Sequence, residues 1–335
     1  MSPLAFSLIV LVVALFITLN SAAITVYAER RIAAFIQNRV GPNRVGPKGL
    51  FQPLADVLKL IMKEDVTPNT GNKFLHTIAP MIPVSTALIV ISVIPFGEGI
   101  YIANINVSVL FILAISSLSV YGVTLAGWSS NSKYSLLGGL RAAAQMLSYE
   151  LPMGLAVASC VVYAGSLNMI DIVHSQAVWW NVFKNPVGFV IFAVAAFAET
   201  NRTPFDLVEA EQELVGGFHT EYSSMKFGMF FLAEYMHVVI ASMLITTFFF
   251  GAYTLPFQPY WLPHMGPWVK GIFDIVIFSL KTVFWVFIFI VVRWTIPRFK
   301  YNQLMHLGWN KLLPLAVANF MVIATLVYLY NIFIG

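Results

Sequence analysis

Charged residues and cysteine are scarce in this sequence. Only 10% of its 335 residues are Asp, Glu, Lys or Arg. The single cysteine, Cys160, lies inside an apolar run, so a disulfide within the chain is excluded. The six histidines are scattered without metal-ligand spacing, and neither a phosphate-binding loop nor a dinucleotide-binding fingerprint is present. We therefore expect no metal, no bound cofactor and no redox centre in this chain.

Hydrophobic residues make up 59% of the chain, and the mean hydropathy is +0.81. The apolar runs are long, whereas a membrane β-barrel would show short alternating segments. They predict an all-α integral membrane protein that forms a single membrane domain, residues 1–335, with eight transmembrane helices. The expected spans are Leu4–Tyr27, Ile78–Phe96, Ile105–Gly127, Ala142–Gly165, the short Pro186–Glu199, Phe230–Leu255, Val269–Val292 and Leu312–Ile334.

Cations are divided unequally between the two sides of these spans. Sixteen of the nineteen Lys and Arg residues fall within the segments that follow the first, third, fifth and seventh spans. The positive-inside rule places these segments on the cytoplasmic or matrix side, and both chain termini on the opposite side.

The first cytoplasmic segment, residues 29–76, is basic. Its Gly-Pro pairs, Gly41–Pro42 and Gly46–Pro47, predict turns, and these turns stand between Arg39 and Lys48. Anionic lipid headgroups are one plausible partner for such cations. Acidic residues elsewhere on the same side of the protein are the other.

An amphipathic helix is predicted from Gln52 to Asp65, because apolar and charged residues form separate stripes. The apolar stripe contains Phe51, Leu54, Leu58 and Ile61, and the charged stripe contains Asp56, Lys59 and Lys63. The helix is too short and too charged to span a membrane, so we expect it in the interface plane. There it can frame a side opening for a lipid-like molecule.

A second cytoplasmic segment, residues 199–226, is acidic. Six of the fifteen acids lie between Glu199 and Glu221, with one cation, Arg202. Three of the acids share one face if the segment is helical: Asp206, Glu209 and Glu213. Like charges so placed repel unless partners or protons neutralise them. A solvated loop is the plain alternative. If the fifth span starts at Pro186, its short apolar run places Glu199 and Arg202 at membrane depth, whereas a start near Trp179 would relax this requirement.

Ionisable residues also occur inside the spans. Glu150 follows Arg141 by nine residues, about 13 Å along a helix, and a charge at such depth costs about 3 kcal/mol. Glu234 lies near the start of the sixth span and Lys281 at the middle of the seventh. We interpret Glu150, Glu199, Glu234 and Lys281 as a polar file within the membrane, with structural ion pairs as the alternative.

Four sequence blocks resemble, in order, those of the quinone-site membrane subunit of NADH:quinone oxidoreductase, respiratory complex I. They are ERR…RVGPN…GPKG…QPLAD..K, GWSSNSKYSLLGGLRAAAQ..SYE, ETNRTPFDLVEAEQELVGGFHTEYSSM and PRFKYNQLMHLGW. The third matches the family hallmark ETNRxPFDLxExExELVxGFxxEYS. The resemblance covers essentially the whole chain.

The resemblance implies a subunit that joins the membrane arm to the peripheral arm, forms the membrane part of a quinone chamber and begins a charged route to proton pumping. Quinone is the implied substrate, and flavin and iron–sulfur clusters belong to partner subunits. The implied partners are the peripheral-arm quinone-site subunits, including the one that carries the terminal iron–sulfur cluster, the small membrane subunits that lead to the antiporter-like subunits, and phospholipid. No nucleic acid is expected. The expected location is the bacterial plasma membrane, with the mitochondrial inner membrane as the alternative.

Carried over residue by residue, the resemblance implies two groups of site residues and no catalytic residue. The quinone-tunnel group is Arg30, Arg39, Asp56, Lys59, Asp206, Glu209, Glu211, Glu213, Phe218 and Arg293. The proton-route group is Glu150, Glu199, Arg202, Glu234, Arg141 and Lys281. The alternatives are the homologous subunit of a membrane-bound hydrogenase and a free-standing cation or proton transporter.

Overall fold

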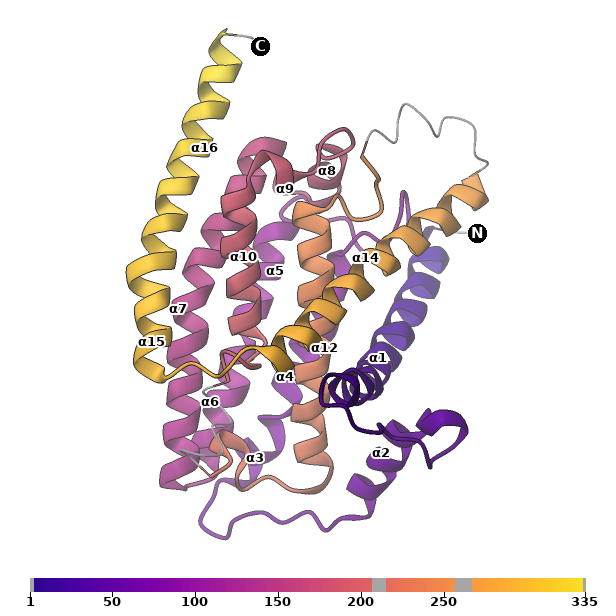
Figure 1. The fold of residues 1–335 in the computed structure, drawn as a ribbon, viewed down its shortest axis with the longest axis vertical. Helices are drawn as coiled ribbons and strands as arrows, with labels where there is room; N and C mark the ends of the chain where they lie inside the picture. Colours follow the sequence, from indigo (N-terminus) through magenta and orange to yellow (C-terminus); the bar gives the residue numbers. More distant parts are fainter. Residues whose placement is uncertain (1–2, 207–214, 257–266, 334–335) are drawn as a thin grey trace.

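The structure is a computed structural model that describes residues 3–206, 215–256 and 267–333. In these ranges the regular structure is helical, and the β contact is an isolated bridge between Gly97 and Ile100. The longer helices are α1 (Pro3–Ile36), α2 (Gln52–Met62), α4 (Met81–Val90), α5 (Ser108–Ser117), α6 (Ser119–Ser129), α7 (Lys133–Ala164), α10 (Pro186–Glu199), α12 (Ser224–Phe249), α14 (Pro267–Thr295) and α16 (Leu313–Phe333) (Figure 1). The shorter segments are η1 (Pro47–Gly49), α3 (Lys73–Ile78), η2 (Ile91–Val93), α8 (Met169–His174), α9 (Asn181–Lys184), η3 (Gly217–His219), α15 (Tyr301–His306) and the π-helical η4 (Leu307–Leu312).

The prediction of an all-α membrane protein is confirmed. Seven helical segments of the described chain are long and apolar enough to cross a membrane: Leu8–Ile36, Lys73–Val93, Ser108–Ser129, Lys133–Ala164, Ser224–Phe249, Val269–Thr295 and Tyr301–Phe333. These seven coincide with predicted spans. The eighth, α10, is an apolar helix of 14 residues, shorter than the roughly 20 residues of a span. A membrane crossing by α10 therefore stays a prediction.

Two helices continue beyond the apolar runs that predict them. α1 reaches Ile36 rather than ending at Tyr27, and α7 begins at Lys133 rather than at Ala142. Hydropathy detects only the part of a helix that lies in hydrocarbon, whereas helical hydrogen bonding continues into polar surroundings. As a result Glu29, at the end of the first apolar run, stands on a helix and not in a loop.

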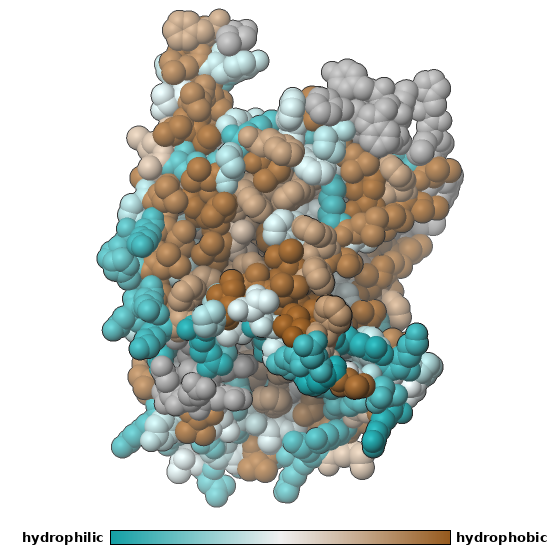
Figure 2. Space-filling model, viewed as in Figure 1, coloured by the Kyte–Doolittle hydropathy of each residue, from teal (hydrophilic) through white to brown (hydrophobic). Residues whose placement is uncertain are grey.

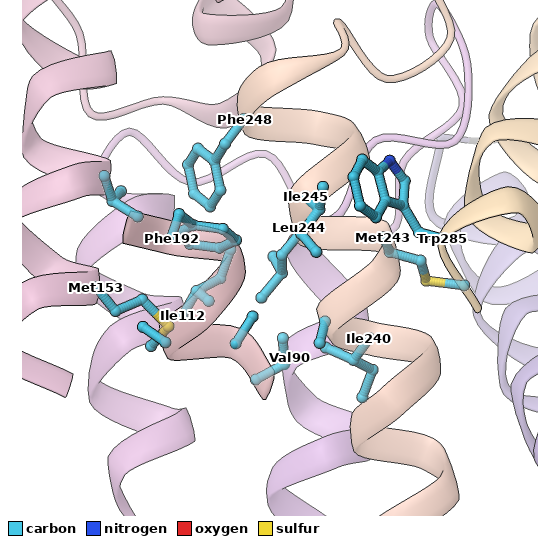
Figure 3. Close-up of a cluster of buried hydrophobic side chains, with 14 of the residues drawn as sticks. Val90, Ile112, Met153, Phe192, Ile240, Met243, Leu244, Ile245, Phe248 and Trp285 are labelled. Carbon is cyan, nitrogen blue, oxygen red and sulfur yellow. The ribbon is translucent and has the colours of Figure 1, made fainter. Parts of the chain in front are cut away.

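The core lies where α7, α10 and α12 meet (Figures 1 and 3). α12 is its central helix: 67% of the residues in its most hydrophobic stretch are buried inside the protein, whereas the corresponding share for Tyr301–Phe333 is 17%. In Figure 3, Phe192 of α10 lies between α12 and Met153 of α7, and the rings of Phe192 and Phe248 are 5.7 Å apart. Close packing of this kind holds membrane helices together, because lipid is as apolar as the side chains. Side chains on α12 are consequently held from several directions.

Hydrophobic and hydrophilic residues occupy different parts of the surface. Figure 2 shows hydrophobic residues over α14 and most of α16, and hydrophilic residues gathered lower down, around α2 and the segment before it. This separation agrees with a membrane-embedded upper part and a polar lower part.

The segment between α1 and α2 forms the predicted turns. Gly46 and Gly49 adopt positive φ angles of 73° and 77°, which L side chains rarely adopt. The carbonyl of Lys48 accepts hydrogen bonds from the Tyr27 hydroxyl at 2.9 Å and from Arg31 at 2.5 Å. Glu209, Glu211 and Glu213 of the acidic segment, which was considered as a partner for these cations, lie outside the described residues.

α2 lies outside the bundle, beside α1 and the first turns of α12 (Figure 1). Its C-terminal end is tied to α12, because Ser224 Oγ donates to the carbonyl of Leu60 at 3.1 Å. The segment just after it is tied to α12 as well, by the pair of Lys226 with Asp65 at 2.9 Å. A helix therefore forms where the sequence predicts an amphipathic one. Its position in the plane of a membrane interface stays a prediction.

Candidate functional site

Four charged side chains meet where α1, α12, α14 and the turn after α10 come together. Arg202 donates from Nη1 to Glu29 Oε2 at 2.7 Å and from Nε to Glu234 Oε1 at 2.5 Å. Arg293 Nη1 lies 2.8 Å from the other carboxylate oxygen of Glu29. Glu29, Arg202, Glu234 and Arg293 are referred to below as the ion-pair cluster.

Charge balance allows the ion-pair cluster to be buried. Two guanidinium groups face two carboxylates, and the Arg202 side chain is only 3% exposed. Charge-assisted hydrogen bonds offset part of the cost of removing such groups from water. With the Tyr235 ring centroid 3.8 Å away, Arg202 is a permanent positive charge held against an aromatic face.

A glutamine on α7 holds the turn that presents Arg202. Gln145 Nε2 donates to the carbonyl of Ala198 at 2.8 Å and to that of Phe205 at 2.7 Å, on either side of Arg202. Gln145 is fully buried, so water does not compete for these carbonyls. The backbone N–H of Phe299 donates to the carbonyl of Pro204 at 3.0 Å. Two other parts of the chain thus fix a turn that lies beyond the end of its own helix.

Two small cavities lie near the ion-pair cluster, and the first of them is lined by one of its members, Glu234. The first has a volume of about 60 Å³ and is lined by Glu199, Glu234 and His237, among others. The second has a volume of about 30 Å³ and shares Glu199, Thr200 and His237 with the first. One water molecule needs roughly 10–15 Å³ on this measure, so each cavity has room for water. The first is referred to below as the carboxylate cavity.

Three carboxylates of the predicted proton route gather at this place. Glu234 belongs to the ion-pair cluster and lines the carboxylate cavity, and Glu199 lines both cavities. Glu150 on α7 is close enough to Glu199 to interact with it electrostatically. Arg202 is in contact with Glu234, so the structure brings together four of the six predicted proton-route residues.

A larger cavity of about 390 Å³ opens between α1, α2 and α12, and is referred to below as the lateral chamber. Its wall is mainly apolar and includes Val26, Val57, Leu60, Phe227, Phe231 and Leu232. Three predicted tunnel residues, Arg30, Asp56 and Lys59, line it as well. Arg30 Nη1 pairs with Asp56 Oδ2 at 2.7 Å, which joins α1 to α2 across the cavity.

The remaining tunnel residues lie elsewhere. Phe218 is buried and lines the carboxylate cavity, Arg293 is part of the ion-pair cluster, and Asp206 pairs with Arg298 at 2.8 Å. Arg39 lies beyond the end of α1, where its Nε donates to Gln37 Oε1 at 2.6 Å. The tunnel predictions for Glu209, Glu211 and Glu213 lie outside the described residues.

Two residues of the predicted proton route are separate from the cavities. Arg141 lies over the ring of Tyr301, 5.4 Å from its centroid. Lys281 Nζ donates to three backbone carbonyls just beyond the end of α12: Phe250, Ala252 and Thr254, at 2.7, 2.9 and 2.6 Å. The indole of Trp180 lies 4.5 Å away. These contacts satisfy all three donors of the ammonium group without a carboxylate.

Glu29 and Tyr235 are the site residues that sequence reasoning did not single out. Glu29 holds both arginines of the ion-pair cluster, and Tyr235 touches Arg202 and lines the lateral chamber. The sequence signal for Glu29 was an acid directly after a long apolar run and directly before Arg30 and Arg31. An acid at this point looks like an ordinary helix end, because its partners are far away in the sequence.

Comparison with known proteins gives a consistent result. The family model described as NADH dehydrogenase matches residues 8–324. The chain is 58% identical over 323 residues to the H-type subunit of NADH-quinone oxidoreductase from Salinibacter ruber, which covers 93% of each chain. It is 58% identical over 322 residues to NADH-quinone oxidoreductase subunit 8 of Rhodothermus marinus, covering 93% of this chain and 94% of the relative. The H-type subunit from Flavobacterium johnsoniae is 44% identical over 334 residues, covering 97% and 95%.

Proposed function

This chain belongs to the NADH dehydrogenase family, as the H-type subunit of NADH-quinone oxidoreductase, respiratory complex I, and we propose that its lateral chamber admits the quinone from the membrane. A quinone combines a ring that carries polar carbonyls with a long apolar tail. The lateral chamber offers contacts of both kinds, since its wall is mainly apolar and Arg30, Asp56 and Lys59 line it. Its volume of about 390 Å³ lies in the range of small-molecule sites.

The observation that carries the proposal is that the lateral chamber adjoins the ion-pair cluster. Tyr235 lines the chamber, and the Arg202 guanidinium lies 3.8 Å from the centroid of its ring. A quinone in contact with Tyr235 would then lie one aromatic ring away from the Arg202 guanidinium. Charge that develops on the quinone is therefore felt by Arg202 and Glu234, because the protein interior screens weakly.

The proton route begins at Glu234 in this proposal. Glu234 accepts from Arg202 on one side and faces the carboxylate cavity on the other. Glu199 and Glu234 share a proton through water in the carboxylate cavity: on Glu234 the proton weakens the attraction for Arg202, and it moves to Glu199 when that attraction is restored. Neighbouring carboxylates titrate as coupled groups, so a change at one shifts the proton occupancy of the next. Glu150 extends the route from Glu199 into the bundle.

Electron transfer belongs to other subunits in this proposal. Flavin and iron–sulfur clusters of the peripheral arm supply the electrons, and this chain admits the quinone, excludes water and holds protons. The side that bears α2 and the acidic segment then faces the cytoplasm and the peripheral-arm quinone-site subunits. The membrane faces contact phospholipid and the small membrane subunits that lead to the antiporter-like subunits. Bacterial relatives favour the plasma membrane as the location.

Photolabelling tests the chamber directly. A quinone carrying an azido group would be irradiated with the whole purified complex, with and without an excess of unlabelled quinone. We expect competed label on peptides from α1, α2 and the first half of α12. The proposal fails if competed label is recovered from the complex and none of it lies on these peptides.

A further inference from the structure

Two phenylalanines of α12, Phe227 and Phe231, line both the lateral chamber and the carboxylate cavity. They are four residues apart and so lie on one face of the helix, with ring centroids 5.9 Å apart. Phe231 in turn lies 5.3 Å from the ring of Tyr235. The three rings form a continuous row along α12.

The other α12 residues around the two cavities are divided between them. The lateral chamber alone is lined by Gly228, Leu232 and Tyr235. The carboxylate cavity alone is lined by Phe230, Ala233, Glu234 and His237. Since Phe227 and Phe231 are common to both sets, their side chains stand between the two spaces.

An aromatic layer in this position has a definite physical effect. Water and protons cross an apolar constriction poorly, because hydrogen bonds given up on entering it are not replaced. The carboxylate cavity is lined by Glu199 and Glu234, whereas the lateral chamber is lined by α1, α2 and the opposite side of α12. Without the rings, water could join the two spaces.

We propose that Phe227 and Phe231 form an insulating wall that keeps the protons on Glu199 and Glu234 from exchanging with the quinone chamber. Communication between the two spaces is then electrostatic, through Tyr235 and Arg202, and not by a continuous file of water. This inference rests on the proposed function of both cavities. It assigns to the two phenylalanines a part in coupling that is distinct from quinone binding.

α2 supports the wall from the chamber side. Gly228 lies between the two phenylalanines in sequence, and a Cβ built on it would lie 3.0 Å from Leu60 of α2. The hydrogen bond from Ser224 to the Leu60 carbonyl fixes this approach one turn earlier. The start of the wall on α12 is therefore held against α2.

The test compares Phe231→Ala with the control Phe287→Ala, which removes the same atoms from an exposed residue of α14 that lines neither of the two cavities. Both variants would be introduced into the whole complex and reconstituted in liposomes. We expect Phe231→Ala to lower the number of protons pumped per electron while NADH:quinone turnover continues, and Phe287→Ala to leave this ratio at the wild-type value. An unchanged ratio in Phe231→Ala overturns the wall, as does an equal fall in both variants.

A second measurement does not depend on turnover and serves if pumping is lost altogether. Cys160 is completely buried, so maleimide labelling of this chain can be followed at a cysteine introduced at the carboxylate cavity by Ala233→Cys. Its peptide would be followed by mass spectrometry after treatment with a water-soluble maleimide. We expect slow labelling with the wall intact and markedly faster labelling when Phe231→Ala is added. Equal rates overturn the inference, whereas a failed photolabelling experiment overturns the proposed chamber instead.

Discussion

The guanidinium of Arg202 lies 2.7 Å from the carboxylate of Glu29, although 173 positions of sequence separate them. Arg202 stands in the turn after α10 and Glu29 on α1, so this contact holds together two distant parts of the chain. Both side chains are almost completely buried, at 3% and 6% exposure. Neither has water as a substitute partner if the other is removed.

Arg202→Met should be strongly destabilising. It leaves Glu29 without one of its two arginines and leaves Glu234 without its ion pair, and breaking a buried ion pair from one side costs about 3–5 kcal/mol. Thermal unfolding of the purified complex measures the loss. Lys270→Met is the control, because its pair with Glu98 is substantially exposed and such pairs contribute roughly 0–1 kcal/mol. Equal shifts in the two variants would contradict the structural role of the ion-pair cluster.

Glu29→Gln should reduce quinone reduction without abolishing NADH oxidation by a flavin-site acceptor. The substitution keeps the shape of the side chain but leaves Arg202 and Arg293 with Glu234 as the one negative charge of the cluster. The ratio of NADH:quinone to NADH:ferricyanide activity measures the effect. Glu64→Gln, at an exposed position after α2, is the matched control. Quinone reductase activity at the control level would mean that Glu29 only balances charge.

Glu234→Gln and Glu150→Gln should each permit assembly but impair either quinone reduction or proton pumping. An amide cannot take up a proton at the position where the route requires one. Turnover and the proton-to-electron ratio in liposomes are the two measurements, with Glu98→Gln, an exposed acid outside the spans, as the control. If both variants keep wild-type turnover and a wild-type ratio, the carboxylate route is wrong.

Asp206→Asn should weaken quinone reduction while electron transfer to a flavin-site acceptor survives. The buried carboxylate of Asp206 pairs with Arg298 at 2.8 Å, and an amide would weaken that attraction at the edge of the Arg202 turn. Arg298→Lys, which retains the cation, should have the smaller effect. Parallel loss of both activities would indicate failed assembly instead of a local effect on the quinone path.

The membrane-spanning helices were the most predictable part of the fold. A run of about 20 apolar residues has few other stable environments, so Ser224–Phe249 and Val269–Thr295 follow almost directly from composition. The end of α1 was not predictable in the same way. Its last nine residues include Glu29 and both following arginines, and nothing in their hydropathy separates a helix from a loop. The contacts that order this part come from distant elements.

Most residues of the candidate site could be predicted from the sequence, but their arrangement in space could not. Buried acids such as Glu150, Glu199 and Glu234 stand out because charge within a span is costly. The resemblance to a known family supplied Arg30, Asp56 and Lys59 before their common cavity was known. The proposed wall between the two cavities could not be predicted from the sequence. In the sequence Phe227 and Phe231 are ordinary apolar residues of a span, and only the structure places them between two cavities.

The attachment of α2 to the start of α12 has a mechanical consequence. A hydrogen bond from α12 to Leu60 of α2, and an ion pair to Asp65 in the segment just after α2, bind this region to the first turn of the helix that carries Phe227, Phe231 and Glu234. Because of these contacts, a sideways movement of α2 would pull on the first turn of α12. A displacement of α2 by a molecule in the lateral chamber would therefore displace the start of α12 as well.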